Sequence, residues 1–301
     1  MKRRQFIVQS GFVAMSISAF GSISWNGKEF VGSTPTTSDI LGPFYRPGSP
    51  LRTNLIPPDN NMPIMELSGT IYDEDGVTAL PDVLIESWQC DEKEKYDNIS
   101  NEYILRGSQK TNENGRYNFR TIIPIPYQDE VVGWRPAHIH LRISSPDRQD
   151  LITQVYFKND PYISSDPPAN SSESQNRILE LEQTATGETQ VEFNIVLGQS
   201  YSLDDAGYQK ITGLYQVEQG LVEYYREDDL LFAKLNGQIL EGFVYQGNNT
   251  FVGGNKMNSV RFEFSLDGST KAHITYWENW PGVEGFPLKM EGIKAFNYGH
   301  R

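Results

Sequence analysis

The chain has 301 residues, and its 39 acidic against 26 basic side chains give a formal net charge of −13. This charge argues against a nucleic-acid partner, which needs a basic footprint, and it means that an anionic substrate would need a local arginine. The single cysteine, Cys90, excludes an internal disulfide framework and is interpreted as a small buried hydrophobe.

The N-terminus carries a targeting pattern. An arginine pair, Arg3-Arg4, precedes a short apolar stretch over 12–23 that is diluted by Ser and Gly. The stretch is too weak to span a bilayer, so residues 1–30 are interpreted as a twin-arginine-type signal peptide with linker. An ordinary secretion signal or a retained tether is the alternative. We therefore expect an exported, periplasmic protein whose mature form has no membrane span.

Short alternating strands separated by turn residues follow the linker. The pattern predicts strands over 67–76, 80–89, 116–122, 151–157 and 191–197, and one helix over 172–184. The Asp75-Gly76 turn between the first two strands predicts a hairpin-like unit. The fold class is thus mainly β, with an antiparallel β-sandwich over 31–205.

A second domain is expected over 206–301, because short strands recur there between close turn signals. They are predicted at 221–225, 230–235, 242–245, 250–252, 260–264 and 273–277, which indicates a β-meander or small barrel. The patterns Asn236-Gly237 and Phe262-x-Phe264 resemble the small β-domains appended to some serine hydrolases. His273 and His300 are lone histidines, so no catalytic cluster is expected here.

The most informative stretch of the first domain is His138-Ile139-His140. Residues two apart on a strand point to the same face, so both imidazoles can chelate one ion. Two core or edge histidines that happen to alternate are the alternative. A zinc hydrolase is less favoured, because zinc usually recruits a third histidine or a carboxylate. Tyr127 follows two prolines in a loop that leads towards this strand, and Tyr96 lies in a charged loop after Trp88.

Ordered motifs over about 38–200 resemble the intradiol ring-cleavage dioxygenases. The motifs are Gly42-Pro43-Phe44-Tyr45, Trp88 with Tyr96, Gly115-x-Tyr117-x-Phe119-Arg120-Thr121, Pro124-x-Pro126-Tyr127, Trp134-Arg135-Pro136-Ala137-His138-Ile139-His140 and Gln154-x-Tyr156-Phe157-x-x-Asp160. The resemblance implies a ferric ion held by Tyr96, Tyr127, His138 and His140. It also implies Arg135 and Gln154 beside the substrate, with Tyr127 as the tyrosinate that takes a substrate proton.

The implied chemistry agrees with these residue types, because phenolate oxygens are hard anionic donors that favour Fe(III). The expected substrates are a catechol-type aromatic diol and O2, and the expected product is a muconate-type diacid. Only a signal and linker precede Gly42, so the core is expected to be closer to the protocatechuate type. A homo-oligomer is left open. An exported, non-catalytic β-sandwich binding module is the alternative function.

Overall fold

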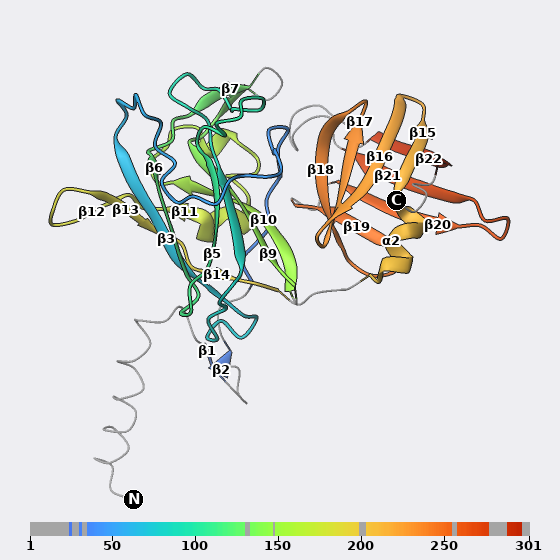
Figure 1. The fold of residues 1–301 in the computed structure, drawn as a ribbon, viewed down its shortest axis with the longest axis horizontal. Helices are drawn as coiled ribbons and strands as arrows, with labels where there is room; N and C mark the ends of the chain where they lie inside the picture. The colour runs from blue at the N-terminus through green and yellow to red at the C-terminus, as the bar shows by residue number, and fades with distance from the viewer. Residues whose placement is uncertain are drawn as a thin grey trace, which may run out of the picture.

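The computed structural model describes residues 24–25, 30–31, 35–129, 133–146, 148–198, 203–254, 258–276 and 288–296. The arginine pair of the predicted signal and His300 lie outside these residues. A β-sandwich and a β-barrel stand next to each other in Figure 1, and a small ribbon of β1 (Ser24–Trp25) and β2 (Phe30–Val31) precedes them. Within the described residues, no helix has the length and apolarity needed to cross a membrane.

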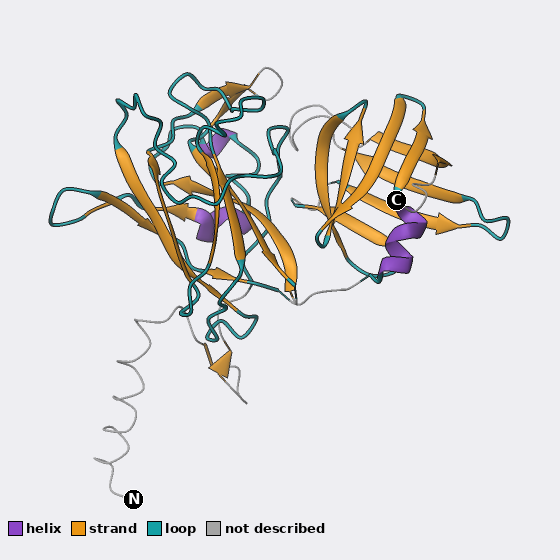
Figure 2. Cartoon of the chain, in the orientation of Figure 1, coloured by secondary structure: helices purple, strands orange, loops and turns teal. Residues whose placement is uncertain are grey.

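The sandwich has two sheets. The site sheet has the order β11 (Ile178–Leu179), β10 (Arg148–Phe157), β9 (His138–Ser145), β4 (Leu84–Trp88) and β5 (Arg106–Lys110). The facing sheet has the order β12 (Glu182–Gln183), β13 (Thr189–Glu192), β3 (Ile64–Tyr72) and β14 (Ile195–Val196), with β6 (Arg116–Ile122) also paired to β3. The mainly β class is thereby confirmed (Figure 2).

Strand β9 shows how the alternating pattern divides the site sheet into two faces. Ile139, Leu141 and Ile143 are fully buried and belong to the core between the sheets. His138 and His140 alternate with them and therefore point out of the opposite face. The outer face of the site sheet thus carries the histidines, and what covers this face decides their surroundings.

The predicted hairpin between the first two strands is wrong. A single bridge joins Tyr72 to Ala79 across the turn, but β3 then pairs within the facing sheet while β4 pairs with β5 and β9 of the site sheet. Pro81 offers no N–H for continued pairing, and Asp82 has a left-handed φ of 58°. The chain therefore turns away after the bridge and crosses from one sheet to the other.

The predicted helix over 172–184 is mostly wrong as well. Only η2 (Ser172–Arg177), a 3₁₀ turn that follows η1 (Ile163–Ser165), is helical in this region. The next residues form β11, which adds in parallel to the edge of β10 with Ile178 opposite Tyr156. Strands β13 and β14 also run parallel to β3. These pairings depend on partners far along the chain, which a local pattern does not report.

The second domain is a closed antiparallel barrel of eight strands. They are β15 (Gly213–Val217), β16 (Gly220–Glu227), β17 (Leu230–Leu235), β18 (Gln238–Tyr245), β19 (Thr250–Gly253), β20 (Ser259–Phe264), β21 (Thr270–Tyr276) and β22 (Leu288–Phe296). The six predicted strands are confirmed, and β15 and β22 close the barrel. Helix α2 (Asp205–Ile211), capped by Asp204, was not predicted. The resemblance to domains of serine hydrolases stays a prediction.

Candidate metal centre

The two histidines are brought together by the pleat of β9. His138 and His140 are buried, and their ring centroids lie 4.9 Å apart. Both stand on the outer face of the site sheet, so the sequence-based expectation of a shared face is met. Tyr127 and Tyr96 lie beside the pair, and the structure thus gathers all four residues that the resemblance proposes as metal ligands.

The hydrogen bonds of His138 define its tautomer. Nδ1 lies 2.7 Å from the backbone carbonyl oxygen of Pro136, which can only accept, so Nδ1 carries the proton. Nε2 is then the lone-pair atom, and it lies 3.2 Å from the phenol oxygen of Tyr96. A histidine that ligates a metal usually donates its other N–H in this way. The ring of His138 is therefore already oriented as a ligand.

His140 is held by packing rather than by hydrogen bonds. Its ring stacks on Trp88, with centroids 4.9 Å apart and planes inclined by 8°. Gly42, which has a φ of +75°, lies so close that an added Cβ would be 3.2 Å from Cε1 of His140. The buried Nδ1 atom of His140 has no hydrogen-bond partner. A buried polar atom without a hydrogen-bond partner lowers the stability of the folded protein. Such an atom is expected where a site is completed by a bound group.

Each tyrosine is fixed by a separate element. Tyr96 stacks on Phe44, with centroids 4.6 Å apart, so the motif that contains Gly42 also supports this tyrosine. Tyr127 begins β7 (Tyr127–Asp129) and pairs with Arg135 at the end of β8 (Gly133–Arg135). The centroids of the two tyrosine rings are 5.7 Å apart, with the rings edge to face.

In the protein without a metal, burial keeps the two histidines and the two tyrosines of the site neutral. Burial lowers the pKa of His138 and of His140 well below the ordinary histidine value, and Arg135 adds to the effect. Burial raises the pKa of Tyr96 and of Tyr127; Arg135 opposes the rise at Tyr127. Neutral imidazole is the form that binds metals. A cation among these four side chains would provide the charge that ionises the phenols.

Arg135 and Gln154 contact each other, and their strand partners are the candidate ligands Tyr127 and His140. Arg135 donates from Nε to Asp166 at 2.8 Å and from Nη2 to the amide oxygen of Gln154 at 3.3 Å. Gln154 pairs with His140 across β9 and β10 and is completely buried. Its amide nitrogen donates to the carbonyl oxygen of Ile40 at 2.8 Å. Both sequence-predicted side chains therefore adjoin the centre in fixed orientations.

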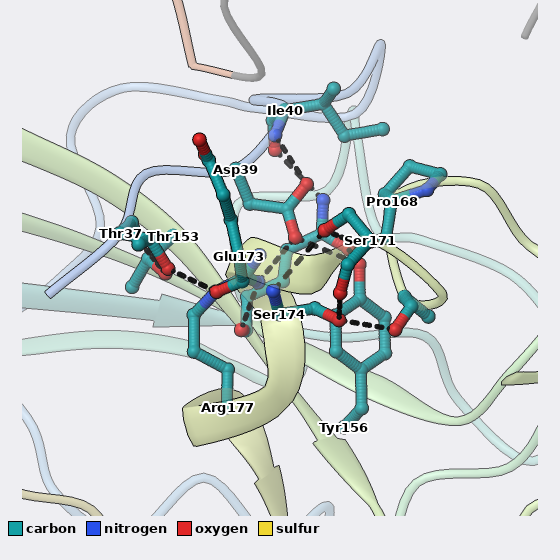
Figure 3. Close-up of polar contacts among 12 residues, drawn as sticks. Thr37, Asp39, Ile40, Thr153, Tyr156, Pro168, Ser171, Glu173, Ser174 and Arg177 are labelled. Atoms are coloured by element: carbon teal, nitrogen blue, oxygen red, sulfur yellow. Dashed lines mark hydrogen bonds and ion pairs between the residues drawn. The ribbon is translucent and has the colours of Figure 1, made fainter. Parts of the chain in front are cut away.

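A polar cluster behind Gln154 holds this part of the site in place. Figure 3 shows Tyr156 and Arg177 converging on the carboxylate of Asp39 beside η2. The Tyr156 hydroxyl donates to Asp39 at 2.9 Å and lies 3.2 Å from the amide oxygen of Gln154. Arg177 forms a buried ion pair with Asp39 and donates to the carbonyl oxygen of Gln154 at 2.8 Å.

Sequence reasoning missed several supports of the site. Asp166, Asp39 and Arg177 gave no local signal, because isolated charged residues are normally solvated. Trp88 and Tyr156 occur in the motifs, but their roles as a stacking partner and a buried hydrogen-bond donor depend on which strands become neighbours. Cys90 is buried as expected.

The donor set fits a trivalent metal ion. Two phenol oxygens and two imidazole nitrogens could hold it, and two phenolates would offset most of its charge in a buried site. The tyrosines are essential, since His, Cys, Asp and Glu alone form no group of three or more that could hold a metal among the described residues. This arrangement differs from the zinc alternative, in which a third histidine or a carboxylate would stand where the tyrosines do.

The β-sandwich with these four residues at its outer face is typical of a dioxygenase domain, and the comparisons with known proteins support this class. The family model described as Dioxygenase matches residues 40–199. Over 154 residues the chain is 34% identical to a chlorocatechol 1,2-dioxygenase of Rhodococcus opacus, covering 44% of this chain and 60% of that protein. It is 32% identical to a 6-chlorohydroxyquinol 1,2-dioxygenase of Cupriavidus pinatubonensis over 186 residues, covering 55% and 64%.

The solved structure of catechol 1,2-dioxygenase from Pseudomonas arvilla C-1 has the same fold, with a TM-score of 0.51 at 24% identity, covering 57% of this chain and 65% of that one. The chain belongs to the intradiol dioxygenase family. The match spans 60% of the length of the Rhodococcus relative, less than two thirds.

Proposed function

We propose that this chain is a non-haem Fe(III) dioxygenase that adds both atoms of O2 to a catechol-type aromatic. The ring would be cleaved between its two hydroxylated carbons to give a muconate-type diacid. The observation that carries the proposal is the convergence of Tyr96, Tyr127, His138 and His140 on one buried region. The relatives named for chlorocatechol, hydroxyquinol and catechol substrates support the substrate class.

Bound Fe(III) would act as a Lewis acid that makes the substrate ring reactive towards O2. The residues of the chain would provide the rest. His138 is oriented by the Pro136 carbonyl oxygen, and Tyr96 lies against its free nitrogen. Tyr127 would be ionised when it holds the metal, since the cation and the neighbouring Arg135 both favour its phenolate. The phenolate oxygen would then accept a proton from the substrate diol.

Arg135 would stabilise the negative charge that develops on the ring. Its guanidinium is buried, is fixed by Asp166 and contacts Gln154, so it needs little reorganisation during the reaction. Gln154 would orient the substrate from the same side. Arg135 and Gln154 are both buried, which strengthens their electrostatic interactions.

The proposal is tested by metal content and product analysis on the full chain. Purified protein loaded with iron should retain about one Fe(III) per chain. It should consume O2 with catechol, a chlorocatechol, hydroxyquinol or protocatechuate, and release a diacid. His140→Ala should abolish iron retention, whereas the matched control His273→Ala, which removes a half-buried histidine of the barrel, should not. Full iron retention by His140→Ala would contradict the ligand assignment.

The role of Arg135 is tested separately. We expect Arg135→Lys to keep its iron but to lose about 10²-fold or more in turnover, because lysine cannot reproduce the paired contacts with Asp166 and Gln154. Parallel losses of iron and turnover would instead assign Arg135 a structural role.

We also propose that the protein is exported by the twin-arginine route. The support is the sequence pattern at residues 3–4 and the apolar stretch after it. Replacing both arginines with lysine should prevent export in a host with this pathway, as measured by periplasmic fractionation. Unchanged export of the Lys-Lys variant would contradict this assignment.

A further inference from the structure

The outer face of the site sheet carries two neighbouring rows of side chains. In the first row, Trp88, His140 and Gln154 are register partners across β4, β9 and β10. In the next row, two residues along each strand, Glu86, Arg142 and Ile152 are partners. Successive rows on one face of a sheet lie about 7 Å apart. The first row belongs to the candidate metal centre, and the second row contacts the barrel.

The barrel contacts this second row through the buried Arg142 and through an apolar cluster. Arg142 donates to Asp228 at 3.0 Å and to Glu227 at 3.5 Å, both at the turn between β16 and β17. Ile152 belongs to a buried cluster with Leu230 and Phe232 of β17. The interface is therefore continuous with the hydrophobic surroundings of the site.

A stack of rings leads from the barrel to His140. Phe232 of β17 stacks on Tyr45, with centroids 5.5 Å apart and planes inclined by 13°. Tyr45 contacts Trp88 at 5.1 Å, and Trp88 stacks on His140. His140 has no hydrogen bond that fixes its Nδ1 atom. Its orientation therefore depends on this packing, and the far end of the stack belongs to the barrel.

The barrel also holds the segment over 38–42, which forms an edge of the site and is called the strap here. On the barrel side, Ser38 donates to the carbonyl oxygen of Gly254, and the backbone N–H of Leu41 donates to the buried carboxylate of Glu241. On the site side, the carbonyl oxygen of Ile40 accepts from Gln154 at 2.8 Å. The last residue of the strap is the glycine that lies against His140.

We propose that the C-terminal barrel is a positioning part of the metal centre, in which Phe232 orients His140 through the ring stack and Glu241 orients Gln154 through the strap. The inference rests on the proposed function of the site as a metal centre. Protein interiors are close-packed, so removing one member of such a series lets the next one move. Neither residue contacts the centre itself, and both act through residues that do.

The experiment compares Phe232→Ala with Phe251→Ala in the full chain. Both remove a fully buried phenylalanine of the barrel, but Phe251 belongs to the barrel core and has no place in the stack. With only four histidines in the chain, the imidazole NMR signals of metal-free protein can be assigned by single substitutions. Phe232→Ala should shift the His140 signals, and Phe251→Ala should leave them in place.

The iron-loaded protein gives the second measurement. Phe232→Ala should release iron to a chelator about 10- to 100-fold faster than the unmodified chain, as expected for loss of a residue that supports a ligand. If the Phe232 variant does not fold, Glu241→Gln tests the strap by the same His140 signals, because the strap ends at Gly42, which lies against His140. In this variant an amide offers one acceptor oxygen where Leu41, Gly242 and Asn258 now donate to two.

The two proposals fail in different ways. An unmodified chain that retains no iron contradicts the proposed function, while the NMR comparison of metal-free variants still decides the positioning role. His140 signals that are unchanged in Phe232→Ala, or that shift equally in Phe251→Ala, overturn the positioning role whatever the iron content. A shift restricted to the Phe232 variant supports it.

Discussion

Glu241 should make the stability of the protein depend on pH in a way that one substitution removes. The side chain is fully buried on β18, and burial raises its pKa from 4.5 to about 7, with the charge of Asp39 adding to the rise. Donation by Asn258, Gly242 and Leu41 opposes this effect only in part. Glu241→Gln keeps the size of the side chain and removes its titration.

The direction and size of the change in unfolding free energy with pH follow from proton linkage. Between pH 4.5 and about 7 the unfolded chain releases the proton of Glu241 while the folded chain keeps it, so stability falls as the pH rises. A difference of about 2.5 pH units at about 1.36 kcal/mol per unit gives a loss of about 3 kcal/mol, complete above pH 7. The glutamine variant should lack this part of the pH dependence.

The assay is urea unfolding at several pH values from 4.5 to 8. The unfolding free energy of the unmodified chain should decline across this range by about 3 kcal/mol more than that of Glu241→Gln. Glu218→Gln, which removes an exposed carboxylate from a turn of the same barrel, is the matched control and should keep the original decline. Equal declines for the unmodified chain and Glu241→Gln would refute the reasoning.

The remaining predictions concern the sandwich. Gly42→Ala should lower the unfolding free energy by about 1–2 kcal/mol and weaken iron binding, because φ is +75° and the new Cβ would press on His140; calorimetry and iron titration measure both. Tyr117→Phe should cost about 1 kcal/mol in urea unfolding by losing the 2.7 Å bond to Phe193, with iron content unchanged. Arg142→Met should cost about 3–5 kcal/mol by leaving buried carboxylates unpaired, and a smaller loss would mean that they are protonated.

Local sequence could predict the parts of the site that depend on local geometry. The alternation of His138, Ile139 and His140 gave a shared face because a pleated strand has a period of two. The six predicted barrel strands followed from short alternating runs between turns. The resemblance to a family added Tyr96 and Tyr127, whose convergence depends on packing, and the structure brings both to the histidines.

The rest depended on which segments become neighbours in space. Residues 178–179 were assigned to a helix, but their pairing with β10 outweighed the local preference. Asp166 accepts a hydrogen bond from Arg135, which is 31 residues away in the sequence, and no local sequence pattern predicts this contact. The barrel looked like an independent appendage, because nothing in the spacing of Phe232 or Glu241 reports that they face Tyr45 and Leu41.

The bond between Ser38 and Gly254 joins residues 216 positions apart. All four candidate ligands precede Gly254 by more than a hundred residues in the sequence. They are therefore translated well before the strap can bond to the barrel. A chain made only as far as the sandwich would contain the four candidate ligands without the bond that holds the strap. The bond that holds the strap to the barrel can therefore form only after the chain has been translated as far as Gly254.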